Sequence, residues 1–225
     1  PNRRSSHTVA TPRGGGWGLM LTLLPAWVWA TWRAGRIEQP HETILIAGAI
    51  ALMAVSWVDD RKGLGPLPRF GVQAIAVALA VAALPTDLSL FDGWLPIWLD
   101  RAVAAFVWLW FVNLFNFMDG IDGIAGGSAV AMGTGVLLVS MIHGPHPLDA
   151  VRGGIIAAAA VGFLVWNWSP ASIFLGDVGS IPLGYLLGYE LLHLAMDGGQ
   201  VAALIIALYY LTDATITLLR RLLRG

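Results

Sequence analysis

The sequence predicts an all-α polytopic membrane protein, and three observations carry that prediction. Of the 225 residues, 57% are hydrophobic and 12% are charged, whereas soluble domains carry about 25% charged residues. The mean hydropathy is +0.71, and the apolar residues lie in long runs. Eleven Trp residues suit a protein with aromatic side chains at membrane interfaces.

Eight apolar runs are candidate spans, each bounded by charged or polar residues, Gly or Pro. A span needs about 20 mostly apolar residues, and a shorter run is accommodated by local thinning of the bilayer. The first four, with their bounding residues, are Trp17–Trp32 (Gly16, Arg33), Thr43–Val58 (Glu42, Asp59), Phe70–Leu84 (Arg69, Pro85) and Ala102–Phe117 (Arg101, Asp119). The last four are Ile124–Ile142 (Gly123, His143), Gly153–Trp166 (Arg152, Asn167), Ile181–Leu194 (Gly179, Asp197) and Val201–Leu219 (Gln200, Arg220). None alternates apolar and polar residues as a membrane β-strand does.

The basic residues predict the orientation of these spans. If eight spans alternate in direction, the side that holds the start of the chain carries nine of the thirteen Lys and Arg residues, and the other side carries four. The nine are Arg3, Arg4, Arg13, Arg61, Lys62, Arg69, Arg220, Arg221 and Arg224; the four are Arg33, Arg36, Arg101 and Arg152. Cytoplasmic loops are enriched in Lys and Arg, so the first side is predicted to face the cytoplasm.

The same alternation places the polar motifs together. The Gly-rich start of the chain, the exits of the second, fourth and sixth spans, and the basic end all fall on the predicted cytoplasmic side. We therefore expect a single polar face. The other side has shorter loops without a dense motif. Glu190 and His193, near that side, are expected to pack against a neighbouring helix.

The second-span exit carries the adjacent carboxylates Asp59 and Asp60. Two such groups can hold Mg²⁺ or remove a proton, although a solvated helix end is the simpler alternative. The fourth-span exit is more specific, because Asn113, Asn116 and Asp119 recur every three residues and so lie near one helical face. Their oxygens suit a hard cation.

Two further segments belong to the predicted polar face. Asn167 opens the sixth exit, where Asp177 is a candidate metal ligand and Phe174 offers a ring on which a nucleobase can stack. Asp177 or Ser180 could instead cap a helix. Near the start, Arg13 precedes Gly14–Gly16, which could form an anion-binding nest.

Composition excludes other classes of protein. The net charge of −1 gives no basic field for nucleic acid, and the absence of Cys removes thiolate catalysis and Cys-ligated metal sites.

Four segments together resemble the polyprenyl-phosphate N-acetylhexosamine-1-phosphate transferases, across nearly the whole chain. The four segments are residues 1–16, residues 59–64, residues 113–123 and residues 174–180. The resemblance implies a ten-helix fold with its active site on the cytoplasmic face of the bacterial inner membrane. It implies a single catalytic domain over residues 1–225, with one helix before Pro1, and with a His-rich loop and a last helix after Gly225.

The resemblance also implies the reaction and the residue roles. A UDP-N-acetylhexosamine would donate its sugar 1-phosphate to undecaprenyl phosphate, with Mg²⁺ or alternatively Mn²⁺ as cofactor, and a homodimer is left open. Asn116 and Asp177 would hold the metal with Asp119 close by. By position, Asp59 would be the base or nucleophile and Asp60 its partner, Arg69 would lie near the lipid phosphate, and Phe174 and Asp122 would bind uracil. Asn113, Asn167 and Arg13 are further candidates for substrate binding.

The subfamily and the alternatives are weighed on the same residues. Residues 117–123, Phe-Met-Asp-Gly-Ile-Asp-Gly, are closer to the branch that initiates O-antigen and capsule synthesis than to the muramoyl-pentapeptide branch. A transporter of anionic lipids or sugars would place its polar residues at mid-membrane, whereas these lie at helix ends. A CDP-alcohol phosphotransferase is rejected because residues 124–142 contain no acid.

Overall fold

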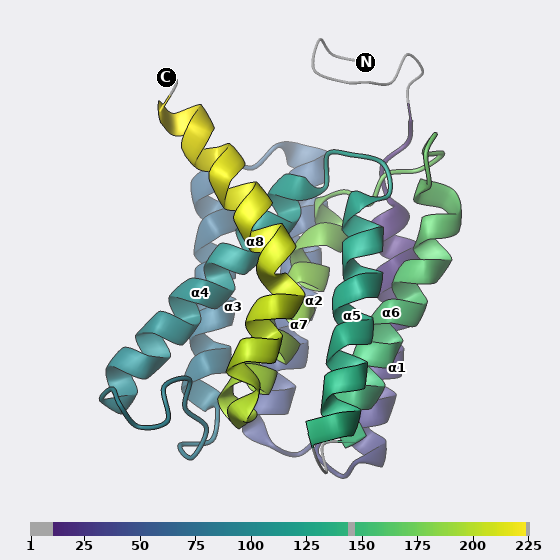
Figure 1. Cartoon of the computed structure of the whole chain (residues 1–225). Helices are drawn as coiled ribbons and strands as arrows, with labels where there is room; N and C mark the ends of the chain where they lie inside the picture. Colours follow the sequence, from purple (N-terminus) through teal and green to yellow (C-terminus); the bar gives the residue numbers. More distant parts are fainter. Residues whose placement is uncertain (1–10, 144–146, 224–225) are drawn as a thin grey trace.

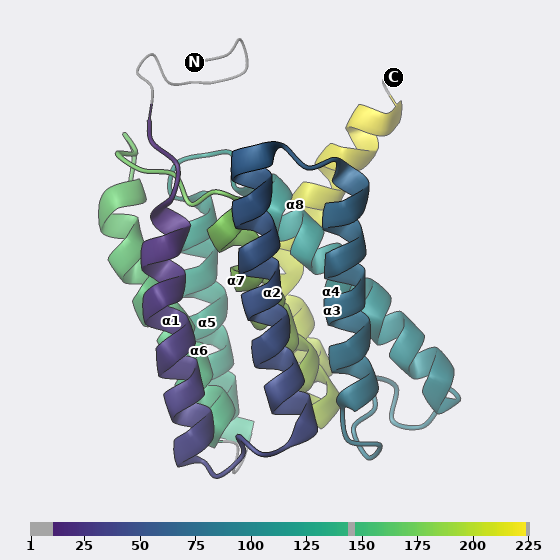
Figure 2. The same ribbon diagram turned by 180° about the vertical axis from the view of Figure 1, so that it is seen from behind.

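The computed structural model describes residues 11–143 and 147–223 and forms one bundle of long helices (Figures 1 and 2). The helices are α1 (Gly15–Arg33), α2 (Pro40–Lys62), α3 (Pro66–Ala83), α4 (Ile97–Met118), α5 (Ile124–His143), α6 (Pro147–Asn167), α7 (Asp177–Leu194) and α8 (Gln200–Leu223). A short π-helical segment, η1 (Ala195–Gly199), joins α7 to α8. Seven of the eight predicted runs lie within one α-helix, and the eighth, Phe70–Leu84, extends one residue past the end of α3; the all-α prediction is confirmed.

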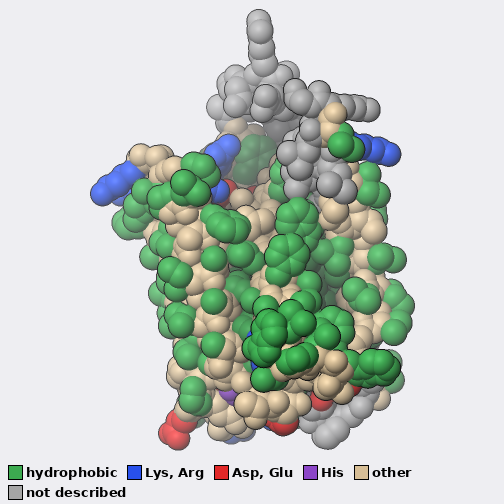
Figure 3. Space-filling model, turned by 90° about the vertical axis from the view of Figure 1, so that its left-hand side faces the viewer, with side chains coloured by type: hydrophobic (Ala, Val, Ile, Leu, Met, Phe, Trp, Pro, Cys, Tyr) green, Lys and Arg blue, Asp and Glu red, His purple; other side chains and the backbone are tan. Residues whose placement is uncertain are grey.

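Six segments of the described chain are long and apolar enough to cross a membrane, and α1, whose run Trp17–Trp32 was predicted as a span, is not among them. They correspond to α2, α3, α4, α5 and α6, and to one segment, Asp177–Thr217, that takes in α7, η1 and most of α8. Asp197 and Gly198 break the helical backbone between α7 and α8, with φ +87° at Gly198. Hydrophobic side chains cover the flank shown in Figure 3, and charged ones gather mainly toward its two ends.

Helix α7 forms the centre of the bundle. Sixteen of its eighteen residues are buried, against neighbours that include α1, α2, α4 and α5. Glycine permits the closest contact: a Cβ on Gly188 would lie 2.6 Å from the ring of Trp108 on α4. The Trp108 indole stacks on Tyr185 at 4.8 Å between ring centroids and donates a hydrogen bond of 2.9 Å to the Tyr185 carbonyl. This packing fixes α7 relative to the other helices.

The polar connections meet at one end of the bundle, as the alternation of the spans predicted. The α2–α3, α4–α5 and α6–α7 connections lie at that end, as do the start of α1 and the end of α8 (Figures 1 and 2). Of the basic residues counted there, Arg3, Arg4 and Arg224 lie outside the described residues, as do residues 1–10 of the first segment that carries the family likeness. One basic residue was predicted wrongly as a loop residue of the other side: Arg152 lies at that end of the bundle, but inside α6 and 1% exposed, because buried carboxylates surround it.

Candidate functional site

The turn between α2 and α3 brings a basic side chain back over the end of α2. Gly63 adopts φ +64°, and its N–H donates to the carbonyl of Asp59, which ends α2 in a left-handed cap. Pro66 then begins α3 at a position where the missing N–H costs nothing. Arg69 consequently lies on the first turn of α3, beside the last turn of α2.

Arg69 forms ion pairs with two of the predicted site carboxylates. Its Nη1 lies 2.7 Å from Asp59 Oδ2, and its Nη2 lies 2.7 Å from Asp177 Oδ2. The side chain of Asp59 is 9% exposed, whereas those of Arg69 and Asp177 are 29% and 28% exposed. The three groups thus lie at an accessible edge, and two carboxylates 118 positions apart share one guanidinium (177 − 59).

The end of α4 faces the first turn of α7. Ser180 donates a 2.6 Å hydrogen bond to Asn116 Oδ1, and the N–H of Gly176 donates to Asp119 Oδ2 at 3.2 Å. Neither Asp177 nor Ser180 caps α7 through its side chain, so the alternative reading of these residues as helix caps is wrong. Asp177 lies instead at the helix N-terminus, where the helix dipole favours a negative charge.

The Asp119 carboxyl has a pKa well above the ordinary value for Asp. Its pKa is raised to about 7, first by burial and then by the negative charge of Asp177, while the Gly176 hydrogen bond and Arg13 oppose the rise. A carboxyl held in this way binds a proton near neutral pH, and a bound cation would compete with that proton.

Asp60 lies on the exposed side of the same group. It is exposed to solvent, and the charges of Asp177, Asp59, Arg13 and Arg69 all act on it. The structure thus brings Asp59, Asp60, Asp119 and Asp177 into one electrostatic neighbourhood with two arginines.

Three predicted residues hold the site together through contacts with the backbone. Asn167 is 3% exposed; its Oδ1 accepts from the Gly123 N–H at 3.0 Å, and its Nδ2 donates to the Ile173 carbonyl at 2.9 Å. Asp122 Oδ2 accepts from the Ala171 N–H at 3.0 Å. These bonds join the α4–α5 connection to the α6–α7 connection. Asn113 lies one turn before Asn116, and its Nδ2 donates to the Leu109 carbonyl in its own helix.

The glycines at the start of α1 do not form an anion nest, and that expectation was wrong. The N–H groups of Gly14 and Gly15 both donate to the carbonyl of Phe174, and the N–H of Gly16 donates to that of Leu175. The donors that an anion would need are therefore taken by the α6–α7 connection. The same pairing sets Arg13 opposite Phe174 in a parallel bridge, so these two predicted residues are neighbours.

Sequence reasoning missed two contributors to this geometry. Ser180 was weighed only as a cap, because its acceptor is 64 positions away. Gly16 and Gly179 allow α1 and α7 to touch: a Cβ on Gly16 would lie 2.4 Å from the Gly179 nitrogen. Nothing in the local sequence marks such a pair, since each glycine is explained only by the other.

The donor set fits a magnesium ion that takes few protein ligands. Among the described residues no group of three or more His, Asp or Glu side chains is arranged to hold a metal. Mg²⁺ in phosphoryl-transfer sites is typically bound by one or two carboxylates together with substrate phosphates and water. Asp177, Asp119 and the amide oxygen of Asn116 supply hard oxygen ligands of that kind.

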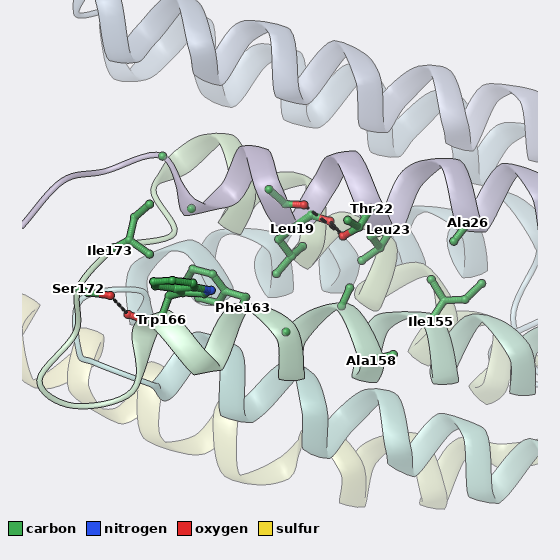
Figure 4. Close-up of a pocket in the computed structure, with 15 residues that line it drawn as sticks. Leu19, Thr22, Leu23, Ala26, Ile155, Ala158, Phe163, Trp166, Ser172 and Ile173 are labelled. Carbon is green, nitrogen blue, oxygen red and sulfur yellow. Dashed lines mark hydrogen bonds between the residues drawn. The ribbon is translucent and has the colours of Figure 1, made fainter.

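Two apolar grooves open on the flanks of the bundle. The larger, about 890 Å³, lies between α1 and α6 beside the α6–α7 connection (Figure 4). The side chains of Leu19, Leu23, Ile155 and Phe163 line it, and the polar groups at its rim are engaged locally, as in the Ser172 hydroxyl that donates to the Trp166 carbonyl. The second groove, about 420 Å³, lies between α4, α7 and α8. Among the described residues, no charged side chain lines either groove.

Comparison with known proteins gives a consistent result. The sequence profile of glycosyl transferase family 4 matches residues 43–195. The chain is 32% identical over 206 residues to a decaprenyl-phosphate N-acetylglucosaminephosphotransferase of Mycobacterium tuberculosis, with 83% of this chain and 51% of that protein covered. It is 27% identical over 235 residues to a probable undecaprenyl-phosphate N-acetylglucosaminyl 1-phosphate transferase of Bacillus subtilis, with 99% and 63% covered.

A third relative belongs to the other branch weighed above. The chain is 33% identical over 217 residues to a phospho-N-acetylmuramoyl-pentapeptide-transferase of a Synechococcus species, with 87% of this chain and 61% of that protein covered. The chain thus spans between half and two thirds of the length of these curated relatives.

Proposed function

This chain belongs to glycosyl transferase family 4, and on that basis we propose that it carries the catalytic face of a polyprenyl-phosphate N-acetylhexosamine-1-phosphate transferase. The donor would be a UDP-N-acetylhexosamine, the acceptor undecaprenyl or a related polyprenyl phosphate, and the products UMP and a lipid-pyrophosphate-linked sugar. The observation that carries the proposal is Arg69, which joins Asp59 to Asp177 at one end of an otherwise apolar bundle.

The reaction assigns a task to each residue of this group. An oxygen of the acceptor phosphate attacks the β-phosphorus of the donor; the new P–O bond forms as the bond between the two donor phosphates breaks, and UMP leaves with that electron pair. Asp59 removes the remaining proton of the acceptor phosphate, and Arg69 holds the phosphate at the edge of the bundle. Asp60 supports Asp59 from the solvent side.

The metal belongs to the donor half of the site. Asn116 and Asp177 would hold Mg²⁺, with Mn²⁺ as an alternative and Asp119 beside them, and when bound the ion would neutralise charge on the donor pyrophosphate. Phe174 would stack on uracil, Asp122 would hydrogen-bond it, and Arg13 would lie beside the donor phosphates.

The groove between α4, α7 and α8 suits the prenyl chain. Its α4 wall is formed by Val103, Val107, Trp108 and Phe111, and the same helix carries Asn116 at its polar end. The lining also includes Leu90, Phe91 and Gln200 toward the opposite end of the bundle, so a prenyl tail in this groove would have to extend along α4 past Phe111 for its phosphate to reach Asn116.

The proposed orientation and pathway follow the sequence. The polar end would face the cytoplasm of a bacterial inner membrane, because UDP-sugars are charged and the basic residues favour that side. The sequence of residues 117–123 favours the branch that initiates O-antigen and capsule synthesis.

A topology reporter tests the orientation. A fusion near Lys62 or Gly120 is expected to read cytoplasmic, and one near Asp92 or Pro145 external, because α2 and α4 end at the polar end of the bundle. The opposite pattern at two or more sites would overturn the proposed orientation.

An assay of UMP release tests the reaction itself. The complete protein would be supplied with undecaprenyl phosphate, Mg²⁺ and each member of a panel of UDP-N-acetyl sugars. UMP is expected with one or a few donors and only when the lipid phosphate is present. If UMP release did not depend on the acceptor for any donor, the proposed reaction would be wrong.

Replacing Phe174 by Ala tests the assignment of the nucleotide site. Loss of a base-stacking ring costs about 1–3 kcal/mol, so the donor affinity is expected to fall by roughly five- to 150-fold. The chemical step should change less. Trp168, which is 68% exposed in the same connection, provides the matched control: Trp168→Ala should bind the donor like the wild type. Calorimetry with the UDP-sugar measures both, and an unchanged affinity in Phe174→Ala would refute the stacking role.

A further inference from the structure

A group of charged side chains is buried at the end of the bundle opposite the candidate site. At its centre is Arg152 of α6, whose side chain is 1% exposed. Its guanidinium forms ion pairs with Glu42 of α2, at 3.6 Å with Glu190 of α7 and at 4.0 Å with Asp149 of α6. It also donates a 2.9 Å hydrogen bond to Thr31 of α1. Four helices therefore meet at one cation.

Two histidines complete the group on its periphery. His193 Nδ1 of α7 lies 3.1 Å from Asp149 Oδ2, and His41 Nε2 of α2 lies 3.7 Å from Glu42 Oε1. We call the six residues the far-end cluster: His41, Glu42, Asp149, Arg152, Glu190 and His193.

Aromatic rings close the cluster from two sides without adding charge. The Arg152 guanidinium carbon lies 4.7 Å from the centroid of the Trp27 ring on α1 and 5.8 Å from that of Tyr189 on α7. Arg36, in the connection between α1 and α2, acts on His41 electrostatically but is itself exposed. These are the titratable and charged groups that face the cluster from the helices packed around it, within the described chain.

The cluster has more negative than positive charge if its histidines are neutral. Three carboxylates share one guanidinium, so the negative charges outnumber the fixed positive one. A buried charge that lacks a partner is strongly destabilising, and an ionisable group in that position takes up or releases a proton instead. The far-end cluster therefore requires protons to balance it.

Glu190 is the carboxyl with the poorest compensation. Its side chain is 0% exposed, and neither of its oxygens accepts a hydrogen bond from the described residues. The Arg152 Nη1 atom is 3.6 Å from Glu190 Oε1, beyond hydrogen-bonding distance. The stronger contacts of Arg152 go to Glu42 and Thr31. Glu190 is thus aimed at the cluster without the donors that an ionised carboxylate needs.

We propose that the far-end cluster is a proton-binding site in which Glu190 carries a proton while the four helices are packed. The ligand is a proton rather than a metal ion, because the fixed positive charge of Arg152 occupies the centre. The proposal is independent of the transferase reaction, since no cluster residue belongs to the catalytic face.

The cluster has an outer and an inner layer. The side chains of Asp149 and His193 are each 12% exposed, whereas those of Glu42, Arg152 and Glu190 are 0–1% exposed. The first pair forms the outer layer, and the other three, Glu190 among them, form the interior.

Infrared spectroscopy of the complete protein at neutral pH tests the proposal directly. The wild type should show the C=O stretching band of a protonated, buried carboxyl, and Glu190→Gln should lack that band. Asp100→Asn, which changes a buried carboxyl outside the cluster, should retain it. If Glu190→Gln removed no carboxyl band, the proposal would be overturned.

Thermal unfolding provides the second measurement. A native state that binds more protons than the unfolded state loses stability as the pH rises, so the wild-type Tm should fall from the pH range in which an exposed Glu ionises up to the pKa of Glu190 in the native state. Glu190→Gln mimics the protonated form, and it should keep the wild-type Tm at neutral pH and decline less as the pH rises. A loss of stability in Glu190→Gln at neutral pH as large as in Glu42→Gln would show that Glu190 is ionised, and the proposal would fail.

Discussion

Turnover should fall by about 10²–10⁴-fold when Asp59 is replaced by Asn, because the amide keeps the shape of the side chain but cannot remove the proton from the lipid phosphate. Binding of the UDP-sugar should survive, since Asp59 is assigned to the lipid phosphate. The measurements are single-turnover rates and donor calorimetry. Asp60→Asn is the comparison, with a smaller expected loss, because Asp60 is exposed and has no ion pair with Arg69 among the contacts of the described structure.

The ion pair with Arg69 requires a control of its own. Asp59→Asn also weakens the contact at 2.7 Å that holds Arg69, so part of any loss could come from a displaced arginine. Arg69→Gln isolates that part: it should raise the KM for the lipid acceptor and leave the chemical step less affected. If Asp59→Asn lost donor binding while Phe174→Ala retained it, the assignment of the two residues would be reversed or mistaken.

Two mechanisms are compatible with a catalytic role for Asp59. Asp59 acts either as a base in a single displacement or as a nucleophile that forms a phospho-enzyme. A single displacement inverts the configuration at the transferred phosphorus, whereas two successive displacements retain it. A chiral-phosphorus donor distinguishes them, and inversion would exclude the two-step route.

Asp177→Ala and Asn116→Ala are each expected to abolish Mg²⁺-dependent transfer in a folded protein. The proposed metal site has few protein ligands, so removing one of them should weaken metal binding. The charge of the donor pyrophosphate would then be poorly neutralised. Asp177 is 28% exposed and Arg69 retains Asp59 as a partner, so the fold should tolerate Asp177→Ala. Transfer is measured as a function of Mg²⁺ concentration, with circular dichroism to confirm folding.

Ser180→Ala separates ligand loss from structural damage at Asn116. Asn116→Ala leaves the buried Ser180 hydroxyl without its acceptor, at a cost of about 1–3 kcal/mol. Ser180→Ala breaks the same hydrogen bond but leaves Asn116 Oδ1 in place, so it should keep most of the activity. Near wild-type turnover with unchanged Mg²⁺ dependence in both Asp177→Ala and Asn116→Ala would refute the proposed metal site.

Part of the candidate site could be predicted from the sequence, because that part depends on the order and spacing of residues along the chain. Alternating spans placed the exits of the second, fourth and sixth runs on one side. The ion pairs of Arg69 confirm that the second and sixth exits meet, and the hydrogen bonds to Asn116 and Asp119 add the fourth. The i, i+3 spacing put Asn116 and Asp119 near one face, and the structure turns both toward the first turn of α7.

Other features depend on partners that no local pattern identifies. Gly14–Gly16 were predicted to bind an anion, but their N–H groups meet carbonyls some 160 positions later in the chain (174 − 14). Arg152 was counted as a loop residue, because a charge beside an apolar run is expected in water unless buried carboxylates are known to surround it.

The sequence by itself determined the helices, their alternating direction and the end at which the candidate site residues gather, because hydrophobic run length and order along the chain decide these. Only the tertiary structure decided that Arg69 joins Asp59 to Asp177, that Ser180 holds Asn116 and that Glu190 is buried without a hydrogen bond. Those contacts join residues on different helices, and they follow from how α7 packs against its neighbours rather than from the residues near them in sequence.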